Sequence, residues 1–315
     1  MPDTSHLPWG AEQLWQALEP LLPGLSVEVV ARCESTNTQL LERARRSGGR
    51  RDTPITGPGE LDGVTEQAPS TGQAPMPFGR RADDTQPCLL VAEHQSRGRG
   101  RMGRLWQSSS GASLTFSLGV ALEPRDWSGM SLAVGVAIAD ALDPLPAGGR
   151  PRIGLKWPND LWLLDGPGQG RKLGGVLIET VAVGRRRMVV IGVGLNVTPQ
   201  PTRELSSGYA CLQELIPGVT APEVLHRLAR PLVSALQQFE AQGFAGFAPR
   251  YGTRDLLAGQ PVVTTAAELP AGVAEGVSAD GALRVRTAAG VQLLSSGEVS
   301  VRLQHGDPPP EATPA

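Results

Sequence analysis

Four stretches of the chain place apolar residues at helical spacing, namely 11–22, 36–45, 128–142 and 221–242. The first ends before Pro23-Gly24, which stops a helix. The second follows Ser35, with Thr36 or Asn37 as the expected cap. The last opens with a capping box and an early proline, and Pro231 should kink it.

Between these helices, short apolar runs and alternating patterns predict strands. They cover 26–32, 88–94, 113–121, 153–157, 161–164, 173–183 and 187–197. Their short connections suit antiparallel or mixed pairing, and 183–186 predicts a hairpin. This part of the chain is therefore expected to be α/β (α+β), a mixed sheet with helices.

After Arg254 the pattern changes to five short strand-like runs separated by glycine-containing turns, at 261–265, 273–278, 283–287, 291–295 and 299–303. So many short strands predict a small closed or nearly closed barrel, which leaves few free edges. We therefore expect a larger domain over 1–253, a small barrel over 254–305 and a disordered tail over 306–315. Residues 47–87 hold almost no large apolar side chains, which predicts a disordered insertion.

Composition limits the classes of partner. The formal net charge is -2 and the isoelectric point about 6.1, so the whole chain does not attract nucleic acid or an anionic membrane, and any anion site must be local. Cys33, Cys88 and Cys211 lie far apart and are expected to be reduced thiols. The start of the chain lacks the pattern of a secretory signal, and no apolar run could span a bilayer, so a cytoplasmic location is expected.

Lysine is scarce. Lys and Arg together number 29, but only Lys156 and Lys172 are lysines. A lysine ammonium is a compact, rotatable charge that suits a reacting carboxylate or phosphate, whereas arginine is the ordinary surface cation of this chain. Both lysines lie in short motif-like strings, which favours a functional interpretation over chance placement.

The strongest local motif is His94-Gln95-Ser96-Arg97-Gly98-Arg99-Gly100-Arg101-Met102-Gly103-Arg104, which follows a predicted strand; we call residues 96–104 the Arg-Gly loop. Glycines let the backbone approach a ligand, and arginines supply bidentate donors for carboxylate or phosphate. A flexible RNA-binding segment is the alternative. The shortness of the string, between a strand and Trp106, favours a small-molecule anion site.

Two further strings hold the lysines. In Lys156-Trp157-Pro158-Asn159-Asp160 the polar side chains project from a turn, although proline followed by Asn-Asp is often only a turn. Lys172-Leu173-Gly174-Gly175 starts an apolar strand, where the lysine could equally be a solvated edge charge. A glycine-rich string at 192–197 ends in Asn196-Val197 but lacks the third glycine of a dinucleotide fingerprint.

Other chemistries lack their motifs. The chain has no phosphate loop of the Gly-x-x-x-x-Gly-Lys type and no serine elbow, and its four histidines show no metal-ligand spacing. Hydrolysis built on histidine or on a histidine-bound metal is therefore disfavoured.

Taken in order over about 27–302, the Ser-Thr-Asn start, the Arg-Gly loop, the Lys-Trp-Pro-Asn-Asp turn and the Lys-Leu-Gly-Gly strand resemble the biotin protein ligases. The resemblance implies a catalytic domain like that of class II aminoacyl-tRNA synthetases and a C-terminal SH3-like barrel. It also implies that biotin and ATP, with Mg2+, give biotinyl-5'-adenylate. A lysine of the biotin carboxyl carrier protein of acetyl-CoA carboxylase then takes the biotin.

The resemblance assigns roles by position. Biotin would be bound by Ser35, Thr36, Asn37, Gln95, Gly98, Arg99, Gly100, Arg101, Lys172 and Gly175. The nucleotide would be bound by Arg101, Arg104, Trp106, Asn159, Asp160, Lys172 and Asn196, with Asp160 also on the metal. Lys172, Arg101 and Arg99 would be catalytic. Trp106 is equally consistent with plain core packing.

Two features depart from the family pattern. About thirty residues precede Ser35, too few for the winged helix-turn-helix of repressor-type members, so a monofunctional ligase without operator binding is expected, as a monomer or homodimer. The 47–87 insertion is longer than usual. A lipoate-protein ligase is the alternative enzyme, and a nucleic-acid-binding protein that uses the Arg-Gly loop is the alternative outside enzymes.

Overall fold

A computed structural model describes residues 7–49, 85–166, 168–184, 186–200, 208–295 and 300–303. Most of the predicted 47–87 insertion and the predicted 306–315 tail lie outside the described residues. Within them, helix α2 (Thr36–Gly49) runs on past Arg45. It begins at Thr36, and the Ser35 hydroxyl accepts a hydrogen bond from the Thr38 N–H at 3.5 Å. Ser35 is therefore the cap, and the prediction of Thr36 or Asn37 was wrong.

The larger domain is built on a seven-stranded mixed sheet of order β1-β2-β5-β9-β8-β7-β6. The strands are β1 (Ser26–Cys33), β2 (Cys88–Gln95), β5 (Ser113–Ala121), β6 (Ile153–Lys156), β7 (Asp160–Gly166), β8 (Gln169–Val183) and β9 (Arg186–Asn196). Strands β1 and β2 are parallel and every other pair is antiparallel. The mixed pairing and the β8–β9 hairpin are confirmed.

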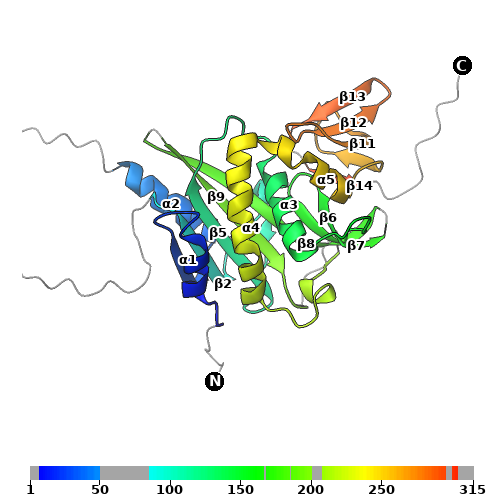
Figure 1. Ribbon diagram of the computed structural model, residues 1–315. Helices are drawn as coiled ribbons and strands as arrows, with labels where there is room; N and C mark the ends of the chain where they lie inside the picture. The colour runs from blue at the N-terminus through cyan, green and yellow to red at the C-terminus, as the bar shows by residue number, and fades with distance from the viewer. Residues whose placement is uncertain are drawn as a thin grey trace, which may run out of the picture.

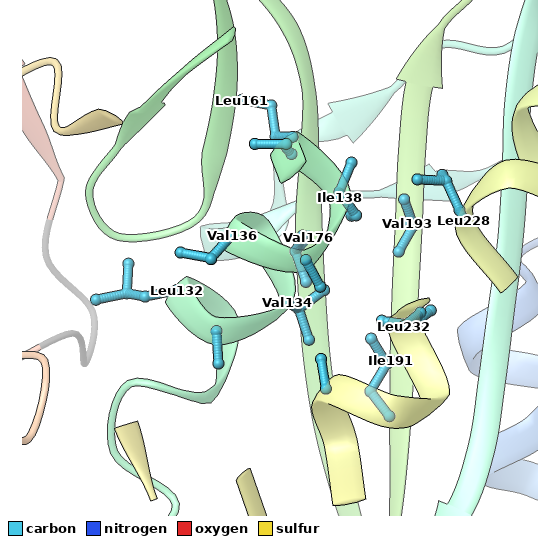
Figure 2. Packing of buried hydrophobic residues seen from close by; sticks show 14 of the residues in the cluster. Leu132, Val134, Val136, Ile138, Leu161, Val176, Ile191, Val193, Leu228 and Leu232 are labelled. Carbon is cyan, nitrogen blue, oxygen red and sulfur yellow. The ribbon is translucent and has the colours of Figure 1, made fainter. Parts of the chain in front are cut away.

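Helices cover both faces of this sheet (Figure 1). Helices α3 (Met130–Leu142) and α4 (Ala221–Gln242) pack together on one face. Figure 2 shows Ile191 and Val193 of β9 pointing toward Leu228 and Leu232 of α4. Helix α4 begins as predicted, with the Thr220 N–H donating to Glu223 at 2.9 Å, and it continues through Pro231.

The opposite face of the sheet packs against α2. Leu89 and Val91 of β2 belong to the large core, whereas Leu90 packs with Leu40 and Leu41 of α2. Successive strand residues point to opposite faces, so β2 is apolar on both sides because helices bury both. Helix α1 (Ala11–Leu18) lies beside β1 and α4.

Helix α5 (Ala248–Arg254), which the sequence analysis missed, leads into a five-stranded antiparallel sheet of order β13-β12-β11-β10-β14. Its strands are β10 (Pro261–Thr264), β11 (Ala271–Val277), β12 (Leu283–Thr287), β13 (Gly290–Leu294) and β14 (Val301–Leu303). All five predicted strands are confirmed. Within the described residues β13 and β14 are the two ends of the sheet, so the predicted barrel closure does not appear in its pairing.

A short hairpin and three 3-10 turns complete the described chain: the hairpin pairs β3 (Gly98–Arg99) with β4 (Leu105–Trp106), and the 3-10 turns are 101–103, 212–214 and 244–246. In the part of the chain that the structure covers, no helix combines the length and apolar character needed to cross a bilayer.

Candidate active site

One cavity of about 760 Å³ collects the side chains that the sequence analysis selected. Its size is typical of a small-molecule site. Every selected residue except Gly98 lines it, which brings together Ser35, Thr36, Asn37, Gln95, Arg99, Gly100, Arg101, Arg104, Trp106, Asn159, Asp160, Lys172, Gly175 and Asn196. Gly98 lies behind the lining, where an added Cβ would be 2.3 Å from the Trp106 carbonyl oxygen.

One end of the cavity has a buried polar floor. The Gln95 Oε1 accepts from the Thr36 N–H at 2.7 Å and from the Thr36 hydroxyl at 3.1 Å. The Ser117 hydroxyl lies 2.6 Å from Thr36 Oγ1. The Ser108 hydroxyl accepts from the Gln95 N–H and donates to the Gln95 carbonyl, which fixes the backbone of Gln95. Buried polar groups need such partners, and these contacts hold the polar side chains of this part of the lining in fixed positions.

Asn37 is 3% exposed and its amide is oriented by its neighbours. Nδ2 donates to the Leu177 carbonyl at 3.1 Å and to Glu179 Oε2 at 3.0 Å, while Oδ1 accepts from Ser117 at 2.6 Å. Gly192 makes this position possible, because an added Cβ would lie 2.2 Å from Asn37 Oδ1.

The Arg-Gly loop projects as the β3–β4 hairpin at the side of the cavity. The Ser96 and Arg97 N–H groups donate to the Cys33 and Glu34 carbonyls, both at 2.9 Å, which ties the start of the loop to β1. Met102 has φ 54°, the left-handed region that non-glycine residues seldom adopt. Trp106 packs its ring on Gly194 of β9, where an added Cβ would be 2.5 Å from Cε2.

Among the described residues, the cavity lining holds six cations and one carboxylate, Asp160; the cations are Arg99, Arg101, Arg104, Lys156, Lys172 and Arg302. In a chain of net charge -2, this is a local concentration of positive charge, and the composition had indicated that any anion site must be local. Burial lowers the pKa of Arg101, and Arg104 lowers it further while Asp160 raises it. Burial also lowers the pKa of Lys156, with Lys172 and the nearby arginines acting in the same direction against Asp160.

Lys172 and Asp160 form the central ion pair, with Nζ 2.7 Å from Oδ1. Their side chains are 27% and 21% exposed, so both still face the cavity. Gly175 leaves room for this pair, since a Cβ there would lie 3.1 Å from Asp160 Oδ1 and 3.9 Å from Lys172 Nζ. Lys172 is therefore a cavity residue and not a solvated edge charge.

The turn before Asp160 is fixed from three sides. Ser131 of α3 donates to the Pro158 carbonyl at 2.9 Å, Asn159 Nδ2 donates to the Val176 carbonyl at 2.6 Å, and Trp157 Nε1 donates to the Gly281 carbonyl at 3.0 Å. Helix, sheet and C-terminal sheet thus all position the same turn. It is a turn, as the pattern predicted, and it also lines the cavity.

Asn196 closes the cavity beside Lys172. Its Nδ2 donates to the Ala210 carbonyl at 3.0 Å and to the Lys172 carbonyl at 3.3 Å. The Ala210 N–H also donates to the Lys172 carbonyl, at 3.0 Å. Tyr209, which precedes Ala210 in the chain, also lines the cavity, and its hydroxyl donates to the Thr198 carbonyl at 2.8 Å.

Sequence reasoning singled out Lys156 as a rare lysine but gave it no site role, and it missed Trp162, Tyr209 and the segment 300–303, which contains β14 and Arg302. Lys156 lies 4.8 Å above the Trp162 ring, a cation-π contact. The scarcity of lysine was a signal for Lys156. Arg302 had no local signal, because only the fold carries the C-terminal sheet to the cavity, where Arg104 donates to Ser300 at 3.1 Å.

The described residues contain no group of three or more His, Cys, Asp or Glu side chains able to hold a metal ion. Mg2+ in nucleotide sites is commonly held by one or two carboxylates together with substrate phosphates. Asp160, which is partly exposed and lies among the cations of the cavity, fits that pattern as the one carboxylate of the described lining.

Comparison with known proteins identifies the family of this chain. Residues 69–196 match the Biotin/lipoate A/B protein ligase family and residues 259–302 match the Biotin protein ligase C terminal domain. Biotin–acetyl-CoA-carboxylase ligase of Mycobacterium tuberculosis is 34% identical over 251 residues, covering 76% of this chain and 88% of that protein.

Bifunctional ligase/repressor BirA of Salmonella typhimurium is 34% identical over 220 residues, covering 67% of this chain and 66% of that protein. This chain thus matches slightly under two thirds of that relative's length. Among solved structures, the biotin protein ligase from Aquifex aeolicus in complex with biotin and ATP shares the fold, with a TM-score of 0.63, 24% identity and coverage of 89% of this chain and 99% of that chain. This chain therefore belongs to the Biotin/lipoate A/B protein ligase family, among the biotin protein ligases.

Proposed function

We propose that this protein is an ATP-dependent biotin protein ligase. It would join biotin and ATP into biotinyl-5'-adenylate and pyrophosphate, and then transfer biotin to a lysine of a biotin carboxyl carrier domain of acetyl-CoA carboxylase. The observation that carries this proposal is the excess, within the described lining, of six cations over one carboxylate in a cavity that also has a buried, hydrogen-bonded polar region around Thr36 and Gln95. Such a cavity suits a ligand with an uncharged polar ring and several negative charges.

In the first step a carboxylate oxygen of biotin attacks the α-phosphorus of ATP, and the bond to pyrophosphate breaks. The reacting groups are both anionic, so positive charge must be fixed between them. Lys172 would bridge the carboxylate and an α-phosphate oxygen, and Asp160 orients its ammonium through the 2.7 Å contact. Arg101 and Arg104 would hold the phosphates from the Arg-Gly loop.

The biotin ring would occupy the polar floor. Ser35, Thr36 and Gln95 supply donors and acceptors suited to a ureido group, and Gly100 of the Arg-Gly loop lines the same cavity, where its backbone could contact the ligand. Asn159, Asn196 and Trp106 would line the nucleotide side. Mg2+ bound at Asp160 would supply charge neutralisation to the phosphates when present.

In the second step the acceptor amine attacks the acyl carbon of the mixed anhydride, the bond to the phosphate oxygen breaks, and AMP leaves while the amine loses a proton. Water would compete with the amine. The Arg-Gly loop would order over the adenylate and exclude water until the acceptor arrives.

The test is incubation with ATP, Mg2+ and an acceptor domain, with either biotin or lipoate, followed by mass spectrometry of protein and acceptor. We expect biotinyl-adenylate on the enzyme and one biotin on the acceptor. Transfer of lipoate alone would support the alternative ligase, and absence of biotin transfer would reject the proposal. The match of residues 259–302 to a biotin protein ligase domain favours biotin.

A further inference from the structure

Glu179 of β8 lies outside the cavity lining but contacts two elements that form it. Its Oε1 is 3.0 Å from Arg99 Nη2, and its Oε2 accepts from Asn37 Nδ2 at 3.0 Å. One oxygen therefore holds the Arg-Gly loop, and the other holds the first turn of α2. The Glu179 side chain is 24% exposed and its partner Arg99 is 47% exposed, so solvent weakens this ion pair without removing it.

Arg99 carries the connection on the loop side. Besides Glu179, its Nη1 donates to the Thr38 hydroxyl at 3.2 Å. Its guanidinium thus joins the loop to both β8 and α2, and it uses two nitrogens to do so. Arg99 was selected as a catalytic residue that grips substrate. Its contacts here give its charge a partner within the protein instead.

Asn37 carries the connection on the other side. Its Oδ1 accepts from Ser117, whose hydroxyl also contacts Thr36, and Thr36 contacts Gln95. A continuous series of polar contacts therefore runs from the Arg-Gly loop through Glu179 to the ring-binding floor. Asn37 also donates to the Leu177 carbonyl and Arg99 to the Thr38 hydroxyl, but Glu179 is the side chain that contacts both of them, so a change at Glu179 affects the loop and the floor.

We propose that Glu179 is a positioning residue that holds the Arg-Gly loop against α2 through Arg99 and so retains the acyl-adenylate between the two half-reactions. This inference rests on the proposed ligase function. Glu179 does not itself line the cavity and acts only through Arg99 and Asn37, so its effect would fall on loss of the intermediate more than on its formation.

The sharpest variant is Glu179→Gln, because the glutamine oxygen can still accept from Asn37 while the charge opposite Arg99 is removed. Adenylate would be formed with biotin, ATP, Mg2+ and pyrophosphatase, separated from free ligands by desalting, and its release followed with time. We expect release roughly five- to tenfold faster, as for loss of a partly exposed ion pair, with the rate of adenylate formation changed less than about threefold.

Glu34→Ala is the matched control, since it removes a carboxylate that faces Arg97 of the same loop at 3.7 Å but is 67% exposed. It should release adenylate at the wild-type rate. The double variant Arg99→Ala with Glu179→Gln should release it no faster than Arg99→Ala alone, because the two residues act as one contact.

Hydrogen exchange without ligands separates failure of this inference from failure of the proposed function. Glu179→Gln should speed exchange of the amides in residues 98–106, and Glu34→Ala should not, whatever reaction the protein catalyses. Unchanged exchange together with an unchanged release rate would overturn the role of Glu179. An equal loss in adenylate formation and retention would also overturn it, because Glu179 would then support the whole site.

Discussion

At the scale of single residues, the site depends on where this chain keeps its rare lysines. Lys156 and Lys172 are the two lysines among the 29 Lys and Arg residues of the chain, and both line the cavity. Composition therefore identified site residues that spacing alone left ambiguous. Arg302 could not be found in this way, because arginine is common in the chain and its position depends on long-range packing.

Lys172→Ala tests the central charge. The variant removes the ammonium that would stabilise negative charge developing between carboxylate and phosphate, so adenylate formation should fall about 100-fold or more, equivalent to about 3 kcal/mol. Biotin binding, which relies mostly on the polar floor, should weaken less. Single-turnover rates and biotin titration measure the two effects.

Lys172→Arg is the control for that experiment, since it keeps the charge but not its compact shape. It should bind biotin and form adenylate at an intermediate rate. Equal losses in biotin affinity and in the rate of adenylate formation for Lys172→Ala would argue against a transition-state role.

At the scale of elements, alternation and helical spacing predicted the long segments well, including β5 at its observed bounds. They failed for β3 and β4, which have two residues each, and for α5, whose seven residues include Pro249 and Gly252. Such segments are too short to show a period and are fixed by their neighbours. Strand order was also beyond the sequence, because pairing joins residues far apart in the chain.

Gly194→Ala tests how β9 supports the hairpin. The added Cβ would lie 2.5 to 2.9 Å from three atoms of the Trp106 ring, so the ring must move. Overpacking of this kind costs about 1–3 kcal/mol. We expect at least about tenfold weaker binding of biotin and ATP by calorimetry. Gly252→Ala, with nothing within 4 Å of its Cβ, should bind both normally.

Arg101→Gly tests the shielding role of the Arg-Gly loop. Charge-assisted contacts contribute about 1.5–3 kcal/mol, so their loss should release the activated biotin at least about tenfold faster. The released adenylate should then label lysines of bystander proteins, which streptavidin blotting detects. A variant that still labels only the acceptor would contradict shielding by this loop.

At the scale of the whole molecule, the site is assembled across the junction of the two sheets. Arg254, whose side chain is fully buried, pairs with Asp140 and Asp143 of the α3 region at 3.0 and 2.9 Å. Trp157 and Arg104 add bonds to Gly281 and Ser300. The C-terminal sheet therefore has a fixed position from which β14 brings Arg302 to the cavity, and the expected boundary near 253–254 falls at the end of α5.

Asp255, the next residue, makes this junction sensitive to pH. It bridges to Leu155 of β6, and its Oδ2 is buried without a hydrogen-bond partner among the described residues. Burial raises the pKa of Asp255 from 3.8 to about 6, against the lowering effect of the Leu257 and Ala258 N–H groups. The folded chain therefore keeps this proton at pH values where the unfolded chain has lost it.

The sign of the effect follows from this difference. Below pH 3.8 both states are protonated, and between pH 3.8 and about 6 only the unfolded state ionises, so the free energy of unfolding should fall as pH rises through that window. The full loss, up to about 3 kcal/mol for a shift of this size, should remain at higher pH.

Asp255→Asn removes the ionisation and should raise stability at pH 7.5 while changing it little at pH 4. Urea unfolding at both values measures this, and the exposed Asp126→Asn should show no such difference. If Asp255→Asn were no more stable than the parent at pH 7.5, Asp255 would not be the source of the pH dependence at this junction.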